Sequence, residues 1–179
     1  MAKVGIVCVA ATAFVFAGLA AGCGGSDSSS TPTDTAGTAS NERLTAEQWS
    51  TYQAAAEPFA AANTALLKKF DTCPKSGTGD TTVFAKCLGD TLTTVEAATR
   101  ELTSTLAGFN GTVTGACATS LAAYTSYTTP YLASVTSLET AIDSANAAAF
   151  PNAYSNTQTA AKGGTKERTA FETDCKPAS

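Results

Sequence analysis

Histidine is absent from this chain of 179 residues, and its absence excludes the catalytic pairs in which an imidazole activates a serine or a cysteine. The sequence also contains no Gly-x-Ser-x-Gly elbow and no glycine-rich loop of the kind that holds phosphates. Basic residues are few and mostly scattered, and the formal net charge of -4 disfavours a nucleic-acid partner. We therefore expect a protein that is not an enzyme, uses no cofactor and binds no nucleic acid.

Acidic residues occur in pairs that suit acid–base chemistry only if they face one another. The candidate pairs are Glu96 with Glu101, Glu139 with Asp143, and Glu172 with Asp174. A solvated helix face is the simpler interpretation, since only Glu139 and Asp143 have the i,i+4 spacing that shares a face. Like charges at that spacing repel, so this pair is the one to test as a contact for a cation or a partner.

The N-terminal region has the three parts of a secretory signal. Lys3 supplies a positive charge, residues 4–19 are almost wholly apolar, and small residues at 20–22 precede Cys23. The apolar run is shorter than the roughly 20 residues of a transmembrane helix and has no basic flank after it. The sequence therefore predicts a signal peptide over 1–22 that is cleaved before Cys23.

The tetrad Ala20-Ala21-Gly22-Cys23 resembles the lipobox of bacterial lipoproteins, whose cysteine thiol receives a diacylglycerol before the signal peptide is removed. The resemblance covers residues 1–23 and implies lipidation of Cys23, because two acyl chains give stable membrane anchoring. The alanine and threonine bias and the style of the signal resemble lipoproteins of high-GC Gram-positive bacteria, the actinobacteria. That resemblance implies a lipid-anchored domain on the extracytoplasmic face of the cell membrane.

Residues 23–43 are predicted to form the lipidated cysteine and a flexible tether. Beyond Cys23 the stretch is rich in Ser, Thr, Gly, Asp and Ala and has a single Pro32, with no large apolar side chain to stabilise a fold. A Ser/Thr-rich stalk outside the cell can carry O-linked sugars, and the alternative is a bare spacer. Both interpretations place the folded domain at residues 44–179.

The domain is predicted to be an all-α, antiparallel, up-down four-helix bundle. Apolar side chains recur at steps of three and four in four segments, at 49–70, 84–109, 113–142 and about 152–175. A capped start at 45–48 precedes the first segment. Pro58 and Pro130 lie inside the first and third helices and are expected to kink them. The pair Gly163-Gly164 makes the last segment the least regular.

Four cysteines remain for the domain once Cys8 has left with the signal peptide and Cys23 has taken the lipid. They are Cys73, Cys87, Cys117 and Cys175. An even number in an exported domain predicts two disulfides. In an up-down bundle the first two lie at one end and the last two at the other, which favours the pairs Cys73–Cys87 and Cys117–Cys175. A metal site would need closely spaced cysteines or histidines, so we expect no metal; wide spacing also argues against a redox pair.

Aromatic residues at helical spacing include Tyr124, Tyr127 and Tyr131, which the simplest interpretation places in the core. Tyr127 stands slightly off the main apolar stripe and close to Pro130, where a kink would open a groove. An apolar ligand or a partner helix could bind there. These three residues form the predicted groove.

Two functions remain open at this level. The preferred one is a non-enzymatic, membrane-anchored lipoprotein that acts by protein contact, as an accessory or sensory subunit beside an envelope complex. The alternative is a carrier whose bundle holds a small apolar or lipid-like molecule. Tight packing of the helices would favour the first function, and a cavity lined by small residues would favour the second.

Overall fold

The computed structural model describes residues 41–74 and 81–178. The predicted signal peptide over 1–22, the lipid-modified Cys23 and most of the predicted tether lie outside this part of the chain. The described residues form helices and, beyond them, no strand longer than an isolated bridge. The all-helical class predicted from the apolar spacing is confirmed.

Six helices form in the described residues, where the apolar spacing predicted four. They are α1 (Ala46–Thr72), α2 (Thr81–Leu88), α3 (Thr91–Gly108), α4 (Gly115–Asp143), α5 (Phe150–Lys162) and α6 (Thr165–Cys175). Two predicted helices are interrupted because Gly89 and Gly164 take left-handed conformations, with φ of +52° and +80°. The segment predicted at 84–109 therefore divides into α2 and α3, and the last one divides into α5 and α6.

The start of α1 is fixed by its own side chains. Thr45 Oγ1 accepts a hydrogen bond from the Gln48 N–H at 3.2 Å, and Gln48 Oε1 accepts one from the Thr45 N–H at 2.9 Å. This reciprocal pair is the capping box that the sequence predicted at 45–48.

The two interior prolines do not end their helices. Pro58 lies inside α1 and Pro130 lies inside α4, and each helix continues beyond its proline. Each proline lacks one backbone N–H donor. The kinks expected from these residues stay a prediction.

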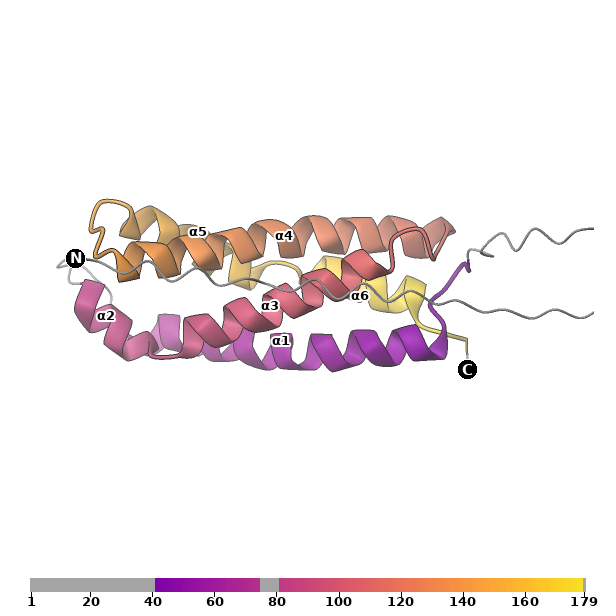
Figure 1. Ribbon diagram of the computed structural model, residues 1–179, viewed down its shortest axis with the longest axis horizontal. Helices are drawn as coiled ribbons and strands as arrows, with labels where there is room; N and C mark the ends of the chain where they lie inside the picture. Colours follow the sequence, from indigo (N-terminus) through magenta and orange to yellow (C-terminus); the bar gives the residue numbers. More distant parts are fainter. Residues whose placement is uncertain (1–40, 75–80, 179) are drawn as a thin grey trace, which may run out of the picture. The chain divides into compact units, whose positions relative to one another are not determined.

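Helix α3 lies between α1 and α4 and packs against both (Figure 1). Helices α5 and α6 pack against α4, and α5 also contacts α1. The apolar stripes face inward in this arrangement. Fully buried side chains come from every long helix, with Leu66 on α1, Leu102 on α3 and Leu138 on α4, and Phe171 adds one from α6.

The chain before α1 is joined to two distant segments by backbone hydrogen bonds. The Asn41 N–H donates to the Thr112 carbonyl at 3.2 Å, and the Leu44 N–H donates to the Cys175 carbonyl at 3.0 Å. Sequence composition placed residues 41–43 in the tether, whereas these contacts bring them onto the helical unit. Backbone pairing of this kind leaves no trace in composition.

Both predicted disulfides are confirmed. Cys73 caps the end of α1 and is bonded to Cys87 of α2, with their Cα atoms 5.8 Å apart. Cys117, in the first turn of α4, is bonded to Cys175 at the end of α6, with Cα atoms 4.7 Å apart. Each disulfide thus joins two helices close to their ends.

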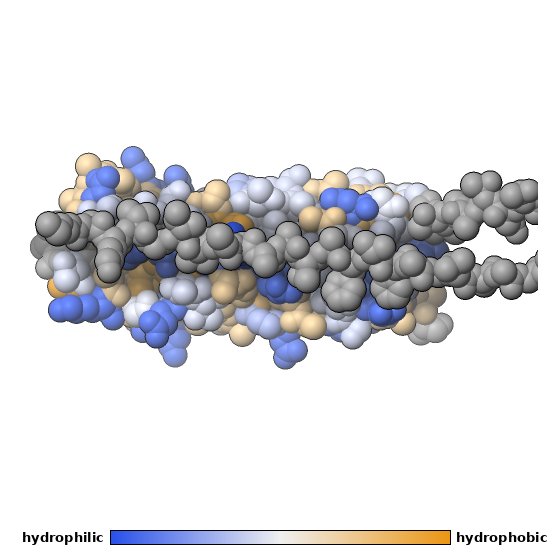
Figure 2. All heavy atoms as spheres, in the orientation of Figure 1, coloured by the Kyte–Doolittle hydropathy of each residue, from blue (hydrophilic) through white to orange (hydrophobic). Residues whose placement is uncertain are grey.

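The surface carries few large apolar side chains. Val83, which is 47% exposed, is the single exposed large hydrophobic residue of the described segments. On the face seen in Figure 2, hydrophilic residues are interspersed with weakly hydrophobic ones. Among the helices of the described part of the chain, none combines the length and the apolarity needed to span a bilayer.

Candidate functional site

The three tyrosines of the predicted groove stand in a row on α4. Ring centroids are 6.3 Å apart for Tyr124 and Tyr127 and 5.9 Å apart for Tyr127 and Tyr131, and both pairs are stacked. Tyr124 and Tyr131 are buried, with 1% and 0% of their surface exposed, whereas Tyr127 is half-buried. The structure thus places two of the three in the core and leaves Tyr127 at its edge.

Hydrogen bonds fix two of these rings. The Tyr131 hydroxyl donates to Asn63 Oδ1 at 2.6 Å, and Asn63 Nδ2 donates to the Ala161 carbonyl at 3.0 Å. The Tyr127 hydroxyl donates to the Ala160 carbonyl at 2.9 Å. Asn63 is the single polar position in the apolar stripe of the first predicted helix, and its amide joins α1, α4 and α5.

Tyr127 lies against the backbone that links α5 to α6. A Cβ atom on Gly164 would overlap the Tyr127 ring, and one on Gly163 would lie 3.4 Å from the ring atom Cε2. From the sequence, this glycine pair indicated only that the last helical segment is the least regular. The structure adds a second reason for glycine, because a side chain on Gly164 would occupy the space of the ring.

Two hollows flank Tyr127. The smaller, of about 140 Å³, has Tyr124 and Tyr127 in its wall and lies where α6 begins. The larger, of about 570 Å³, is lined by Tyr127, Pro130 and Tyr131 together with residues of α5. The larger hollow lies beside Pro130 and contains two of the three tyrosines predicted to form a groove there, while the third, Tyr124, is not in its wall. Its use by a ligand or a partner stays a prediction.

Burial keeps the tyrosine row protonated. It raises the pKa of Tyr124 to about 12, and it also raises the pKa values of Tyr127 and Tyr131. A hydroxyl that stays protonated at neutral pH donates hydrogen bonds but does not act as a general base. The row is suited to binding and orientation.

A polar cluster beside the row was missed by the sequence analysis. Glu172 Oε1 accepts hydrogen bonds from the Tyr52 hydroxyl at 2.9 Å and from Arg168 Nε at 2.7 Å. The neighbouring Tyr124 hydroxyl is buried without a hydrogen-bond partner in the described part of the chain. Burial, with Tyr124 and Glu172 close by, raises the pKa of Tyr52. The members come from three helices, and spacing along the chain therefore could not reveal them.

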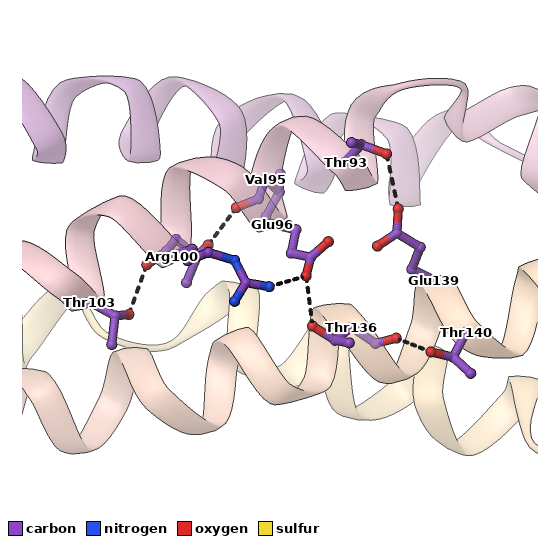
Figure 3. A network of polar contacts seen from close by, with 9 residues as sticks. Thr93, Val95, Glu96, Arg100, Thr103, Thr136, Glu139 and Thr140 are labelled. Carbon is purple, nitrogen blue, oxygen red and sulfur yellow. Dashed lines mark hydrogen bonds and ion pairs between the residues drawn. The ribbon is translucent and has the colours of Figure 1, made fainter. Parts of the chain in front are cut away.

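A second cluster joins Glu96 on α3 to Glu139 on α4, whose carboxyl groups point toward one another (Figure 3). The two groups are close enough that each shifts the pKa of the other. Glu96 Oε1 also accepts from Arg100 Nη2 at 2.6 Å and from Thr136 Oγ1 at 3.2 Å, and Glu139 Oε1 accepts from Thr93 Oγ1 at 2.9 Å. These contacts connect the exposed edges of two neighbouring helices.

The pKa values of the two carboxyl groups shift in opposite directions. The hydrogen bond from Glu139, helped by the Arg100 guanidinium, lowers the pKa of Glu96. Burial, together with the bond to Glu96, raises the pKa of Glu139. Asp143, which the sequence analysis paired with Glu139, adds a smaller repulsion in the same direction. The main partner of Glu139 is therefore on the neighbouring helix.

The described segments contain no group of three or more acidic, cysteine or histidine side chains placed to hold a metal ion. No family model, curated protein or solved structure matches this chain. Its own geometry offers hydrogen-bond donors around the smaller hollow and aromatic and small apolar walls around the larger one. Both features are suited to binding.

Proposed function

We propose that this protein is a membrane-anchored, extracytoplasmic lipoprotein that acts without catalysis, through protein contacts, as an accessory or sensory subunit beside an envelope complex. The observation that carries the proposal is the tetrad Ala20-Ala21-Gly22-Cys23 after an apolar signal. The two disulfides support it, because such bonds persist in oxidising compartments outside the cytoplasm.

For the fold we propose an antiparallel up-down four-helix bundle in which α2 with α3, and α5 with α6, each make one interrupted column. Short links at Gly89–Asp90 and Gly163–Gly164 support this grouping, since each connects two helices that follow one another directly. The contacts of α3 with both α1 and α4 support it as well. Pro58 and Pro130 would bend the two long columns.

The larger hollow, which we call the Tyr127 groove, is the contact surface that we propose. It is lined by Tyr127, Pro130 and Tyr131 from α4, and by Ala153 and Ala160 among residues of α5. Aromatic and small apolar side chains suit the apolar face of a partner helix. The well-buried core beneath the groove favours contact at the surface over storage inside.

The alternative function is a carrier of a small apolar or lipid-like molecule. The observation that favours it is the size of the Tyr127 groove, because about 570 Å³ falls within the roughly 300–1,000 Å³ typical of small-molecule sites. The smaller hollow, at about 140 Å³, is too small for a lipid chain. A carrier would therefore have to hold its ligand at the surface.

Intact mass spectrometry of the native protein from membranes, with and without reduction, tests the anchor. We expect a mature chain that starts at acylated Cys23 and gains four hydrogens on reduction, two for each disulfide. A Cys23→Ser variant, which keeps both disulfides, is the control and should not stay with membranes. An unmodified Cys23 in the native protein would overturn the anchor.

Site-specific photocrosslinking separates the two functions. A photoreactive residue at Asn156, which is exposed and lines the Tyr127 groove, is compared with one at Glu101, which is exposed on α3. A reproducible protein adduct from Asn156 alone supports the contact function. A small-molecule adduct from Asn156 moves the assignment to the carrier, and equal labelling from both positions contradicts the groove.

A further inference from the structure

An open cleft lies between α1 and α6. Helix α1 packs along α3 and α6 packs against α4, but no comparable packing joins α1 to α6 in the described part of the chain. Two adjoining hollows, of about 370 and 380 Å³, lie along this opening and share Trp49 and Glu172 in their walls. Each volume falls within the roughly 300–1,000 Å³ typical of small-molecule sites. We call the two hollows together the Trp49 cleft.

Aromatic rings form the floor of the Trp49 cleft. The ring centroids of Trp49 and Tyr52 are 5.1 Å apart, and Tyr52 packs edge-on against Phe171 of α6 with centroids 4.8 Å apart. Tyr52 is buried, whereas Trp49 is only partly buried. Trp49 lies close to the start of α1, which is fixed by its capping box. The cleft therefore presents an aromatic surface whose position is set before a ligand binds.

The indole N–H of Trp49 is a free hydrogen-bond donor. It reaches the surface and has no hydrogen-bond partner within the residues that the structure describes. A partly exposed aromatic ring with a polar tip is suited to a ligand that has both an apolar face and polar edges.

The walls of the cleft carry hydrogen-bond acceptors as well as donors. On α1, Gln53 and Glu57 are exposed, and among the described residues their side chains have no hydrogen-bond partner. On α6, the Tyr52 hydroxyl and Arg168 Nε both donate to Glu172 Oε1, at 2.9 and 2.7 Å. This arrangement holds the Arg168–Glu172 ion pair in place and leaves Glu172 Oε2 available as an acceptor.

Charges along the cleft nearly balance, which disfavours a free ion as the ligand. Three basic and two acidic side chains line it, Arg43, Arg168, Lys176, Glu57 and Glu172. Because the acidic pair needs donors, a proline-rich peptide fits poorly, since each proline lacks a backbone N–H. A partner helix fits poorly as well, because its backbone groups are already bonded to one another.

A sugar ring matches this mixture of groups. It presents C–H groups on one face, which pack against an aromatic ring, and hydroxyl groups around its edge. Each hydroxyl both donates and accepts hydrogen bonds, so it can satisfy amide, carboxylate and guanidinium side chains at the same time.

We propose that the Trp49 cleft binds a neutral oligosaccharide. One sugar ring packs against Trp49, and its hydroxyls bond to Gln53 and Glu57 of α1 and to the Arg168–Glu172 pair of α6. The next sugar unit lies in the adjoining hollow, beside the end of α6. The proposal concerns binding alone, and it stands independently of the membrane anchor and of the Tyr127 groove, which lies between α4 and α5.

The fluorescence of Trp49 in the full chain tests the proposal directly, because the chain has no other tryptophan. Maltotetraose, mannotetraose and chitotetraose are titrated separately, with glycerol at equal hydroxyl concentration as the control and decaproline as a competing class of ligand. We expect a saturable change in emission with at least one oligosaccharide and none with glycerol. Saturation by decaproline alone would replace the sugar by a peptide, and the absence of saturation with every oligosaccharide would overturn the proposal.

Matched variants on α1 locate the site. Glu57 and Glu47 are both exposed, but of the two only Glu57 lines the cleft. We expect Glu57→Ala to weaken oligosaccharide binding about tenfold, because a hydrogen bond to a charged group is lost, and Glu47→Ala to leave it unchanged. Equal losses in the two variants would contradict the site.

Variants of Trp49 separate the aromatic face from the indole donor, with binding measured by calorimetry and folding checked by urea unfolding. Trp49→Phe keeps an aromatic face and loses the donor, so binding should weaken about threefold or more. Trp49→Ala loses both, and binding should weaken about tenfold or more. Unchanged binding in a folded Trp49→Ala variant would show that no sugar packs against this residue.

Discussion

The ring of Tyr127 occupies the space that a side chain on Gly164 would need. Gly164 has a φ of +80°, in the left-handed region, and begins α6 without a side-chain cap. The Tyr127 hydroxyl is held at the same link by the Ala160 carbonyl, 2.9 Å away. One aromatic residue on α4 therefore fixes the path of the chain between α5 and α6, and both hollows depend on that path.

Gly164→Ala should destabilise the domain for two reasons. A left-handed conformation costs an alanine about 1 kcal/mol, and overlap with the Tyr127 ring adds about 2 kcal/mol. Gly111→Ala is the matched control, since Gly111 has a φ of +78° and no atom within 4 Å of an added Cβ. Urea unfolding should show the larger loss for Gly164→Ala. Equal losses would mean that the ring moves aside freely.

Asn63→Ala should cost about 2 kcal/mol, because it leaves the Tyr131 hydroxyl and the Ala161 carbonyl without their partner. Thr64→Ala, at the next and exposed position, should change stability by less than about 0.5 kcal/mol. Combining Asn63→Ala with Tyr131→Phe should recover part of the loss, with a coupling of at least about 0.5 kcal/mol in denaturant unfolding. If the stability losses of Asn63→Ala and Tyr131→Phe simply add, the hydrogen bond between these two side chains does not stabilise the domain.

Glu139→Gln should make the domain as stable as the parent or slightly more stable at pH 7, by up to about 1 kcal/mol. The amide keeps a donor for Glu96 and removes the cost of ionising a group whose pKa is raised. Glu101→Gln, at an exposed position on α3, is the control and should be nearly neutral.

The opposite pKa shifts of Glu139 and Glu96 make the stability of the domain depend on pH in opposite ways. The pKa of Glu139 is raised in the folded state. The contribution of Glu139 to folding stability is therefore present at low pH and is lost as pH rises above the ordinary carboxyl range. The pKa of Glu96 is lowered, so its contribution is lost as pH falls below that range. In thermal unfolding between pH 3 and 8, the stability of Glu139→Gln should depend less on pH than that of the parent just above the ordinary carboxyl range. A steeper dependence in that range would contradict the raised pKa of Glu139.

Removing the two disulfides one at a time should lower the free energy of unfolding by unequal amounts. In the chain-entropy model, the Cys73–Cys87 bond, which spans 14 positions, contributes about 3 kcal/mol, and Cys117–Cys175, which spans 58, contributes about 4 kcal/mol. Paired Cys→Ala variants of each bond, compared by urea unfolding, should follow this order. A larger loss from the shorter loop would show that native packing, not loop length, decides the cost.

Much of the framework could be predicted because it depends on local spacing. Apolar residues at steps of three and four gave the helical class, and the order of the cysteines along the predicted helices gave both disulfides. The break at Gly163-Gly164 was expected from the residue type. The break at Gly89 was missed, because a single glycine within a helical pattern is often tolerated.

The candidate sites were predicted only where one helix supplies them. The row of Tyr124, Tyr127 and Tyr131 could be found because all three lie on α4, although only Tyr127 and Tyr131 line the hollow beside Pro130. The clusters around Glu172 and around Glu96 with Glu139 were missed. Their members are brought together by the relative rotation and register of separate helices, which spacing along one segment does not contain.

The sequence by itself determined the helical class, the pairing of the cysteines and the row of tyrosines, because each follows from residue type and periodicity within short segments. Only the tertiary structure decided that Glu139 lies opposite Glu96, that the Tyr124 hydroxyl is buried beside Tyr52, and that Gly164 makes room for Tyr127. These relationships join side chains far apart in the chain, and they are set by how the helices pack against one another.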